Sequence, residues 1–79
     1  MATIEPPEDW EIEFVEYHLL GTPQISYIVH HLNRFYGMNT SAREVKKILE
    51  KFVGCGMFPL EFSERELKIL EIIRRDFIG

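Results

Sequence analysis

Cysteine, glycine and long apolar runs are scarce in this 79-residue chain, which has one Cys, five Gly and one Trp. The single Cys55 forms no intramolecular disulfide and offers no cysteine pair for a zinc finger, so it is interpreted as a small side chain at a helix end. Apolar runs reach two or three residues, far short of the roughly 20 that cross a bilayer. The N-terminus lacks the basic start and apolar core of a signal peptide. We therefore expect a cytoplasmic protein with no membrane partner.

Positive charge is also scarce, and it is unevenly placed. Residues 1–16 carry six acids and no Lys or Arg, residues 17–52 carry five bases against two acids, and residues 53–79 carry four bases against five acids. The net charge of −4 argues against a protein that coats nucleic acid indiscriminately, because nonspecific affinity comes from neutralising phosphates. A basic middle in an acidic chain is compatible with selective binding at modest affinity.

The composition, 46% hydrophobic and 28% charged, is that of one folded domain with one small core. We expect a mainly α fold of three to four helices. Residues 1–7 contain two prolines and little to bury, and they are interpreted as a flexible lead-in. Residues 8–79 are expected to form the domain.

The clearest helix signal covers residues 41–53. Ser41 and Glu44 form a capping-box pattern, which marks the start of a helix. Apolar residues then recur at helical period and predict a buried stripe of Val45, Ile48, Leu49, Phe52 and Val53. The basic side chains between them are expected to face outward, and Gly54 and Gly56 are expected to end the helix.

A second helix is predicted just upstream, with Thr22 as its cap and Pro23 at its first position. Its apolar face consists of Ile25, Ile28, Val29, Leu32, Phe35 and Tyr36. The stretch Gly37-Met38-Asn39-Thr40 breaks the pattern with turn-forming residues. Two helices joined by a tight, glycine-containing turn are typical of the helix-turn-helix motif.

With this helix pair, residues 9–60 resemble the winged-helix branch of the helix-turn-helix superfamily. The resemblance implies a DNA-binding domain that uses helix 41–53 as its recognition helix in the major groove. Arg43 suits guanine, Asn39 suits adenine, and lysines suit phosphate. The implied contacts to double-stranded DNA are Asn39, Thr40, Ser41, Arg43, Lys46, Lys47 and Lys51, together with His30 and Arg34 on the preceding helix.

The segment before this pair, from Glu8 to Leu20, is ambiguous. Trp10, Ile12 and Phe14 alternate as in a strand, whereas Ile12, Val15 and Leu19 share one helical stripe. We favour a helix that Gly21 closes. Its second stripe of Trp10, Phe14 and Tyr17 suggests contact with a partner subunit, and Glu11, Glu13 and Glu16 are expected to form a solvated acidic face.

The last third of the chain predicts a strand over residues 57–62, a vestigial wing, followed by a helix over residues 63–78. Ser63 and Glu66 repeat the capping-box pattern at the start of that helix. Its apolar side chains cover more than half of its circumference, which suggests a subunit interface. We expect a homodimer, or a contact with another protein, through Leu67, Ile69, Leu70, Ile72, Ile73 and Phe77.

The sequence offers little support for catalysis or for a cofactor. Adjacent His30 and His31 point about 100° apart on a helix and cannot share one metal ion. Ser41 and Ser63 are explained by capping, and phosphate-binding glycine loops are absent. Two functions stay open, a small dimeric transcriptional regulator that binds DNA and a protein-interaction adaptor of similar fold that does not.

Overall fold

The protein is mainly helical, as predicted, in a computed structural model that describes residues 2–3, 7–54 and 61–78. The elements, with η marking π-helical segments, are β1 (Ala2–Thr3), α1 (Asp9–Phe14), η1 (Val15–Leu19), α2 (Thr22–Tyr36), α3 (Ala42–Gly54), β2 (Glu61–Phe62), α4 (Glu64–Ile73) and η2 (Arg74–Ile78). Within these ranges no helix combines the length and apolar character needed to cross a membrane.

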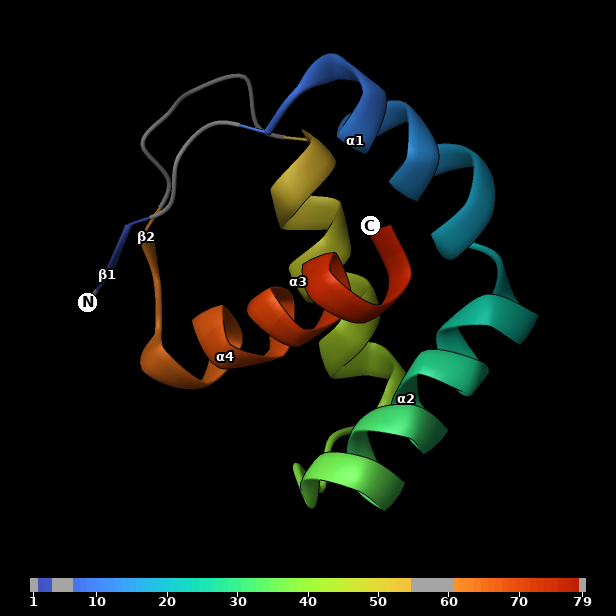
Figure 1. Ribbon diagram of the computed structural model, residues 1–79, viewed down its shortest axis with the longest axis vertical. Helices are drawn as coiled ribbons and strands as arrows, with labels where there is room; N and C mark the ends of the chain where they lie inside the picture. The colour runs from blue at the N-terminus through green and yellow to red at the C-terminus, as the bar shows by residue number, and fades with distance from the viewer. Residues whose placement is uncertain (1, 4–6, 55–60, 79) are drawn as a thin grey trace.

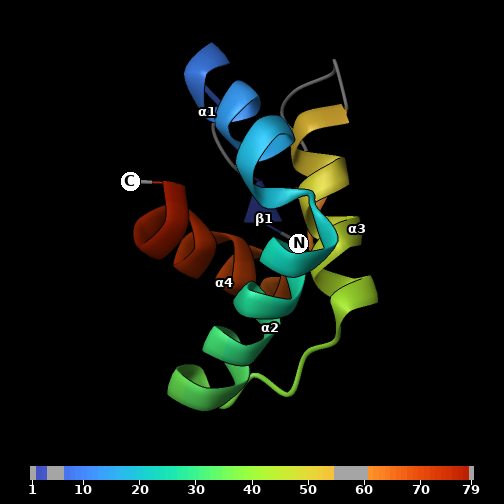
Figure 2. The same ribbon diagram turned by 90° about the vertical axis from the view of Figure 1, so that its right-hand side faces the viewer.

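The helices are arranged around α3. In both side views α2 lies toward the N-terminal end of α3, and α1 lies toward its C-terminal end (Figures 1 and 2). Helix α4 packs against both α2 and α3. The resulting core contains Val15, Leu19, Ile25, Ile28, Leu32, Met38, Val45, Ile48, Leu49, Phe52, Phe62, Ile69, Leu70, Ile72, Ile73 and Ile78.

The ambiguous segment before α2 is helical, and the strand alternative is excluded. Helix α1 continues into η1, where the N–H of Leu20 donates to the carbonyl of Val15 at 3.2 Å, a π-helical spacing. Val15 and Leu19 are buried on one side of this helix. Trp10 and Tyr17 of the second stripe are exposed.

Helix α2 begins one residue earlier than predicted, because Gly21 and not Thr22 is its N-cap. It ends as predicted at Gly37, which adopts the left-handed conformation with φ of 61°. The N–H groups of Gly37 and Met38 both donate to the Leu32 carbonyl. Of the predicted apolar face, Ile25, Ile28 and Leu32 are buried and Val29 is partly buried, whereas Phe35 and Tyr36 are exposed.

Helix α3 confirms the predicted register. Val45, Ile48, Leu49 and Phe52 are all buried, and Val53 is partly buried against them. The helix ends at Gly54, and Cys55 and Gly56 lie outside the described residues.

Helix α4 starts at the predicted capping box, in which the N–H of Glu66 donates to Ser63 Oγ at 3.1 Å and the N–H of Ser63 donates to Glu66 Oε1 at 2.9 Å. Its wide apolar arc serves the chain's own core. The side chains of Ile69, Leu70, Ile72 and Ile73 are buried within the single chain, and those of Leu67 and Phe77 are partly buried. The buried four therefore form no exposed dimer face in this fold, and the homodimer itself stays a prediction.

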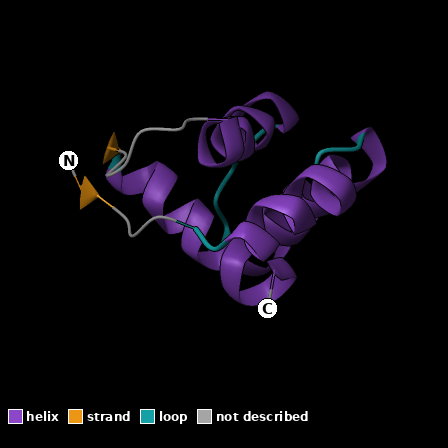
Figure 3. Ribbon diagram, turned by 90° about the horizontal axis from the view of Figure 1, so that it is seen from above, coloured by secondary structure: helices purple, strands orange, loops and turns teal. Residues whose placement is uncertain are grey.

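Two short strands form a ribbon at one edge of the helical body (Figure 3). They pair antiparallel, with Ala2 opposite Phe62 and Thr3 opposite Glu61. Ala2 and Thr3 thus belong to a strand, although they were predicted to be part of a flexible lead-in. Of the strand predicted over 57–62, the last two residues form β2, and residues 57–60 lie outside the described part.

Candidate nucleic-acid interface

The outward side of α3 presents three cations, Arg43, Lys46 and Lys47, which we call the α3 cation face. The helical register that buries Val45 and Leu49 turns these three side chains away from the core, and all three are exposed. Positions 43, 46 and 47 are neighbours on a helix surface because side chains three and four residues apart lie on the same side. The sequence correctly placed these cations on the outside.

None of these three cations has an ion-pair partner among the described residues. Four other cations do, namely Arg65 with Glu44 at 2.7 Å, Arg74 with Glu11 at 2.9 Å, Arg75 with Asp76 at 3.4 Å and Lys51 with Glu66 at 3.9 Å. Arg34 and Lys68 also lack an ion pair within the described ranges, but each lies on another helix. Three cations on one helix face thus stay available for phosphate or base contacts.

Three carboxylates border the α3 cation face. Glu50, which follows Lys46 and Lys47 by four and three positions, is exposed and has no ion pair in the described residues, whereas the other two are already engaged. Arg43 and Lys47 line a hollow between the starts of α3 and α4, together with Glu44 and Glu66. Glu66 closes the capping box of α4. Glu44 accepts hydrogen bonds from Arg65 at 2.7 and 2.9 Å.

Lys51 was predicted to contact DNA, but it faces α4 and β2. Its Nζ lies 3.9 Å from Glu66 Oε1 and 4.6 Å from the centre of the Phe62 ring. The Lys51 side chain is still 37% exposed, so the DNA contact expected for it stays a prediction.

Thr40 was also predicted to contact DNA and is buried, with 7% of its surface exposed. Its N–H donates to Asn33 Oδ1 at 2.7 Å, its carbonyl accepts from Asn33 Nδ2 at 3.0 Å, and its hydroxyl donates to Glu44. All of its polar groups are used in the turn between α2 and α3. Thr40 is a structural residue of that turn.

Asn39 and Ser41 have local roles beside it. Asn39 adopts a left-handed conformation with φ of 51°, which asparagine tolerates better than most residues. Ser41 Oγ accepts from the N–H of Glu44 at 3.2 Å, one half of the predicted capping box. The carboxylate of Glu44 serves Thr40 and Arg65 instead. Both Asn39 and Ser41 remain exposed at the start of α3.

Arg65 holds this turn from α4, a role that was not predicted because no local pattern in the sequence indicates it. Its guanidinium donates to the carbonyls of Met38 at 2.9 Å and Asn39 at 3.2 Å as well as to Glu44. The Arg65 hydrogen bonds, followed by that of Thr40, lower the pKa of Glu44 to about 2. The start of α3 is thereby fixed relative to α4.

His30 and Arg34 are exposed on α2, as predicted, and Arg34 lies 5.8 Å from the centre of the Phe35 ring. Within the described part of the chain no contact joins either of them to the α3 cation face. The DNA contacts expected for His30 and Arg34 therefore stay a prediction.

The acidic face predicted on the first helix is only partly solvated. Glu11 is 5% exposed, and Arg74 donates to both of its carboxylate oxygens at 2.9 Å. Glu13 and Glu16 are exposed, as expected. A buried carboxylate is costly unless it is paired, and Arg74 supplies the partner.

Another polar cluster joins the end of α2 to η2. Asp76 Oδ2 accepts from Tyr36 at 2.7 Å and lies 2.9 Å from His31 Nε2, and Arg75 donates to the Tyr36 hydroxyl at 2.9 Å. The hydrogen bond with His31, then that of Tyr36, lowers the pKa of Asp76. We interpret this cluster as a link between two helices, since each member bonds another.

No group of three or more His, Cys, Asp or Glu side chains in the described residues is arranged to hold a metal ion. No family model, no curated protein and no solved structure matches this chain.

Proposed function

We propose that the protein binds double-stranded DNA through the α3 cation face, as a small regulator of the helix-turn-helix kind. One observation carries the proposal. Arg43, Lys46 and Lys47 are exposed together on one helix face and lack an ion-pair partner in the described residues, whereas Arg65, Arg74 and Arg75 are all paired within the chain. Free cations on a rigid helix suit the phosphates and base edges of a major groove.

The support structure of α3 favours the same function. Its underside is anchored by four buried side chains, and its start is held by Arg65 and Asn33. A recognition helix has to keep its position on the duplex, because a binding site works only when its side chains are held to within about 0.5 Å by a rigid element. The acidic remainder of the surface repels phosphate and so limits binding to this one face.

The test is fluorescence anisotropy of a labelled mixed-sequence duplex at several salt concentrations. We expect the wild type to bind at low salt. In a plot of log binding constant against log salt concentration, Lys46→Ala and Lys47→Ala should each lower the magnitude of the slope by about one. This is the change expected for the loss of one phosphate contact. Lys68→Ala removes an exposed lysine on α4 that has no ion pair within the described ranges, and it is the matched control. Equal salt dependence in all four proteins would remove the site assignment.

The second candidate function is a protein-interaction adaptor without DNA binding. It is favoured by a specific observation, the exposure of large aromatic side chains, with Tyr17 at 82% and Trp10 at 55%. If no duplex binds the wild type at low salt, this candidate replaces the first one.

A further inference from the structure

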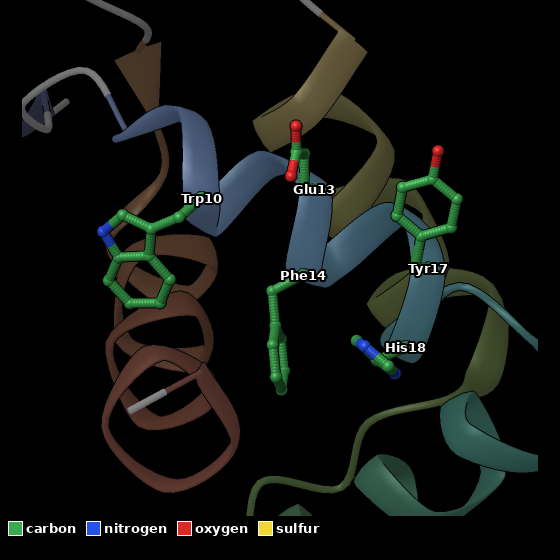
Figure 4. Close-up of a pocket in the computed structure, with 5 residues that line it drawn as sticks. All are labelled: Trp10, Glu13, Phe14, Tyr17 and His18. Carbon is green, nitrogen blue, oxygen red and sulfur yellow. The ribbon is translucent and has the colours of Figure 1, made fainter.

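Beside its buried side, the helix formed by α1 and η1 carries a second stripe that is exposed except at Phe14, which is partly buried against the core. Trp10, Glu13, Phe14, Tyr17 and His18 follow the helical spacing and line one shallow hollow (Figure 4). Trp10 and Tyr17 are 55% and 82% exposed. We call these five residues the aromatic face.

Part of the Phe14 ring packs against the core, and the rest of the aromatic face is open to solvent in the described structure. Its hollow is lined only by residues of α1 and η1, and its one ring contact, between Phe14 and His18 at 4.9 Å, lies within the helix. Clustered aromatic surface of this kind is unfavourable in water and is typical of an interaction site.

The charge around the aromatic face is negative. Asp9, Glu13 and Glu16 are exposed and have no ion pair in the described ranges, and residues 1–16 contain no Lys or Arg. Trp10 also borders a neighbouring hollow that contains Arg74 and Arg75. Those two arginines are paired with Glu11 and Asp76, so they do not neutralise the free acids.

We infer that the aromatic face binds a basic amphipathic helix of a partner protein. Apolar side chains of the partner would pack on Trp10, Phe14 and Tyr17, and its Lys or Arg side chains would meet Glu13 and Glu16. Aromatic rings favour both kinds of contact, because they bury a large apolar area and attract cations to their faces. An extended stripe at helical spacing fits a helix better than a compact ligand.

Charge decides between this partner and two others. A symmetric contact with a second copy would place the same patch on itself and bring Glu13 and Glu16 of both copies together, which is repulsive. DNA is disfavoured for the same reason, because its phosphates would meet the free acids. A partner with positive charge along an apolar helix satisfies both the rings and the carboxylates.

The experiment uses Trp10, which is the only tryptophan of the chain and lies on the face itself. The probe is a synthetic helical peptide of about 20 residues, built from Leu and Lys at helical period and free of aromatic residues. The counter-probe has Glu in place of Lys. We expect the Lys peptide to shift the Trp10 emission to shorter wavelength with saturation, and the Glu peptide to cause no saturating shift.

Two variants test the face, and one matched variant controls for general effects. Tyr17→Ala and the double variant Glu13→Gln/Glu16→Gln should each weaken binding of the Lys peptide about tenfold. Tyr27→Ala removes a ring that is 64% exposed on α2 and should bind like the wild type. Circular dichroism checks that each variant keeps its helices.

Three outcomes would overturn the inference. The first is equal affinity of Tyr17→Ala and Tyr27→Ala for the Lys peptide, and the second is equal affinity of the wild type for the Lys and Glu peptides. The third is a Trp10 emission that depends on protein concentration alone, which would assign the face to a second copy. Duplex binding is measured on the same samples. Since the two faces are separate, Tyr17→Ala should retain wild-type duplex binding, and failure of one proposal leaves the other intact.

Discussion

Helices α3 and α1–η1 pack apolar stripes into the same core, yet the surfaces that they present to solvent differ in charge and in aromatic content. The outward side of α3 carries Arg43, Lys46 and Lys47, whereas the outward side of α1–η1 carries aromatic rings flanked by Glu13 and Glu16. Their undersides differ as well, because α1 buries the carboxylate of Glu11. A common mode of packing therefore leaves the outward residues of the two helices free to differ in charge and polarity.

The largest expected effect comes from the shared core. Leu49→Ala removes a fully buried side chain of α3 and should lower the free energy of unfolding by about 2 to 5 kcal/mol. Lys46→Ala on the outward side of the same helix should change it by less than about 0.5 kcal/mol. Urea denaturation measures both, and similar losses in the two variants would contradict the assigned register.

The next largest loss of stability is expected on the buried side of α1 and not on its outward side. Glu11→Ala leaves Arg74 without its carboxylate and should cost roughly 3 kcal/mol, the lower end of the range for a broken buried pair, because Arg74 is a third exposed. The matched variant Glu13→Ala lies two positions further along the same helix, in solvent, and should be close to neutral. If both variants unfold at the same urea concentration, Glu11 has no structural role.

A smaller effect concerns pH and the start of α3. Folding lowers the pKa of Glu44 from 4.5 to about 2, so its contribution to stability is complete above pH 4.5 and is lost as the pH falls toward 2. In Glu44→Gln this part of the acid dependence should disappear, whereas the exposed Glu50→Gln should retain it. Urea denaturation at a series of acidic pH values measures the difference, and identical profiles would show that the contacts of Glu44 with Arg65 and Thr40 do not stabilise the fold.

Tyr17→Ala should have the smallest effect on folding, within about 0.5 kcal/mol of the wild type, because the side chain is 82% exposed. Thermal melts check this expectation. A large loss of stability would mean that the ring packs on the chain itself and that the aromatic face is part of the core.

Local signals in the sequence predicted much of the helical fold. The capping box at Ser63, the end of α2 at Gly37 and the apolar period of α3 each depend on residues within a few positions of one another. These features therefore required no knowledge of the tertiary structure.

The remaining features depend on residues that are distant in the chain. Glu44 bonds Arg65 from 21 positions away, and Glu11 bonds Arg74 from 63 positions away. Buried Thr40 bonds both Glu44 and Asn33, and the sequence shows neither contact. The wide apolar arc of α4 suggested a dimer because the sequence did not show that α2 and α3 both pack on it.

The most direct test of the DNA-binding proposal is an NMR titration of the isotope-labelled protein with a duplex at low salt. We expect the largest amide shifts along α3, around Arg43, Lys46 and Lys47, with little change at Trp10 and Tyr17. Shifts concentrated on α1–η1, or none in the presence of excess duplex, would contradict the assignment of α3 as the DNA-binding helix.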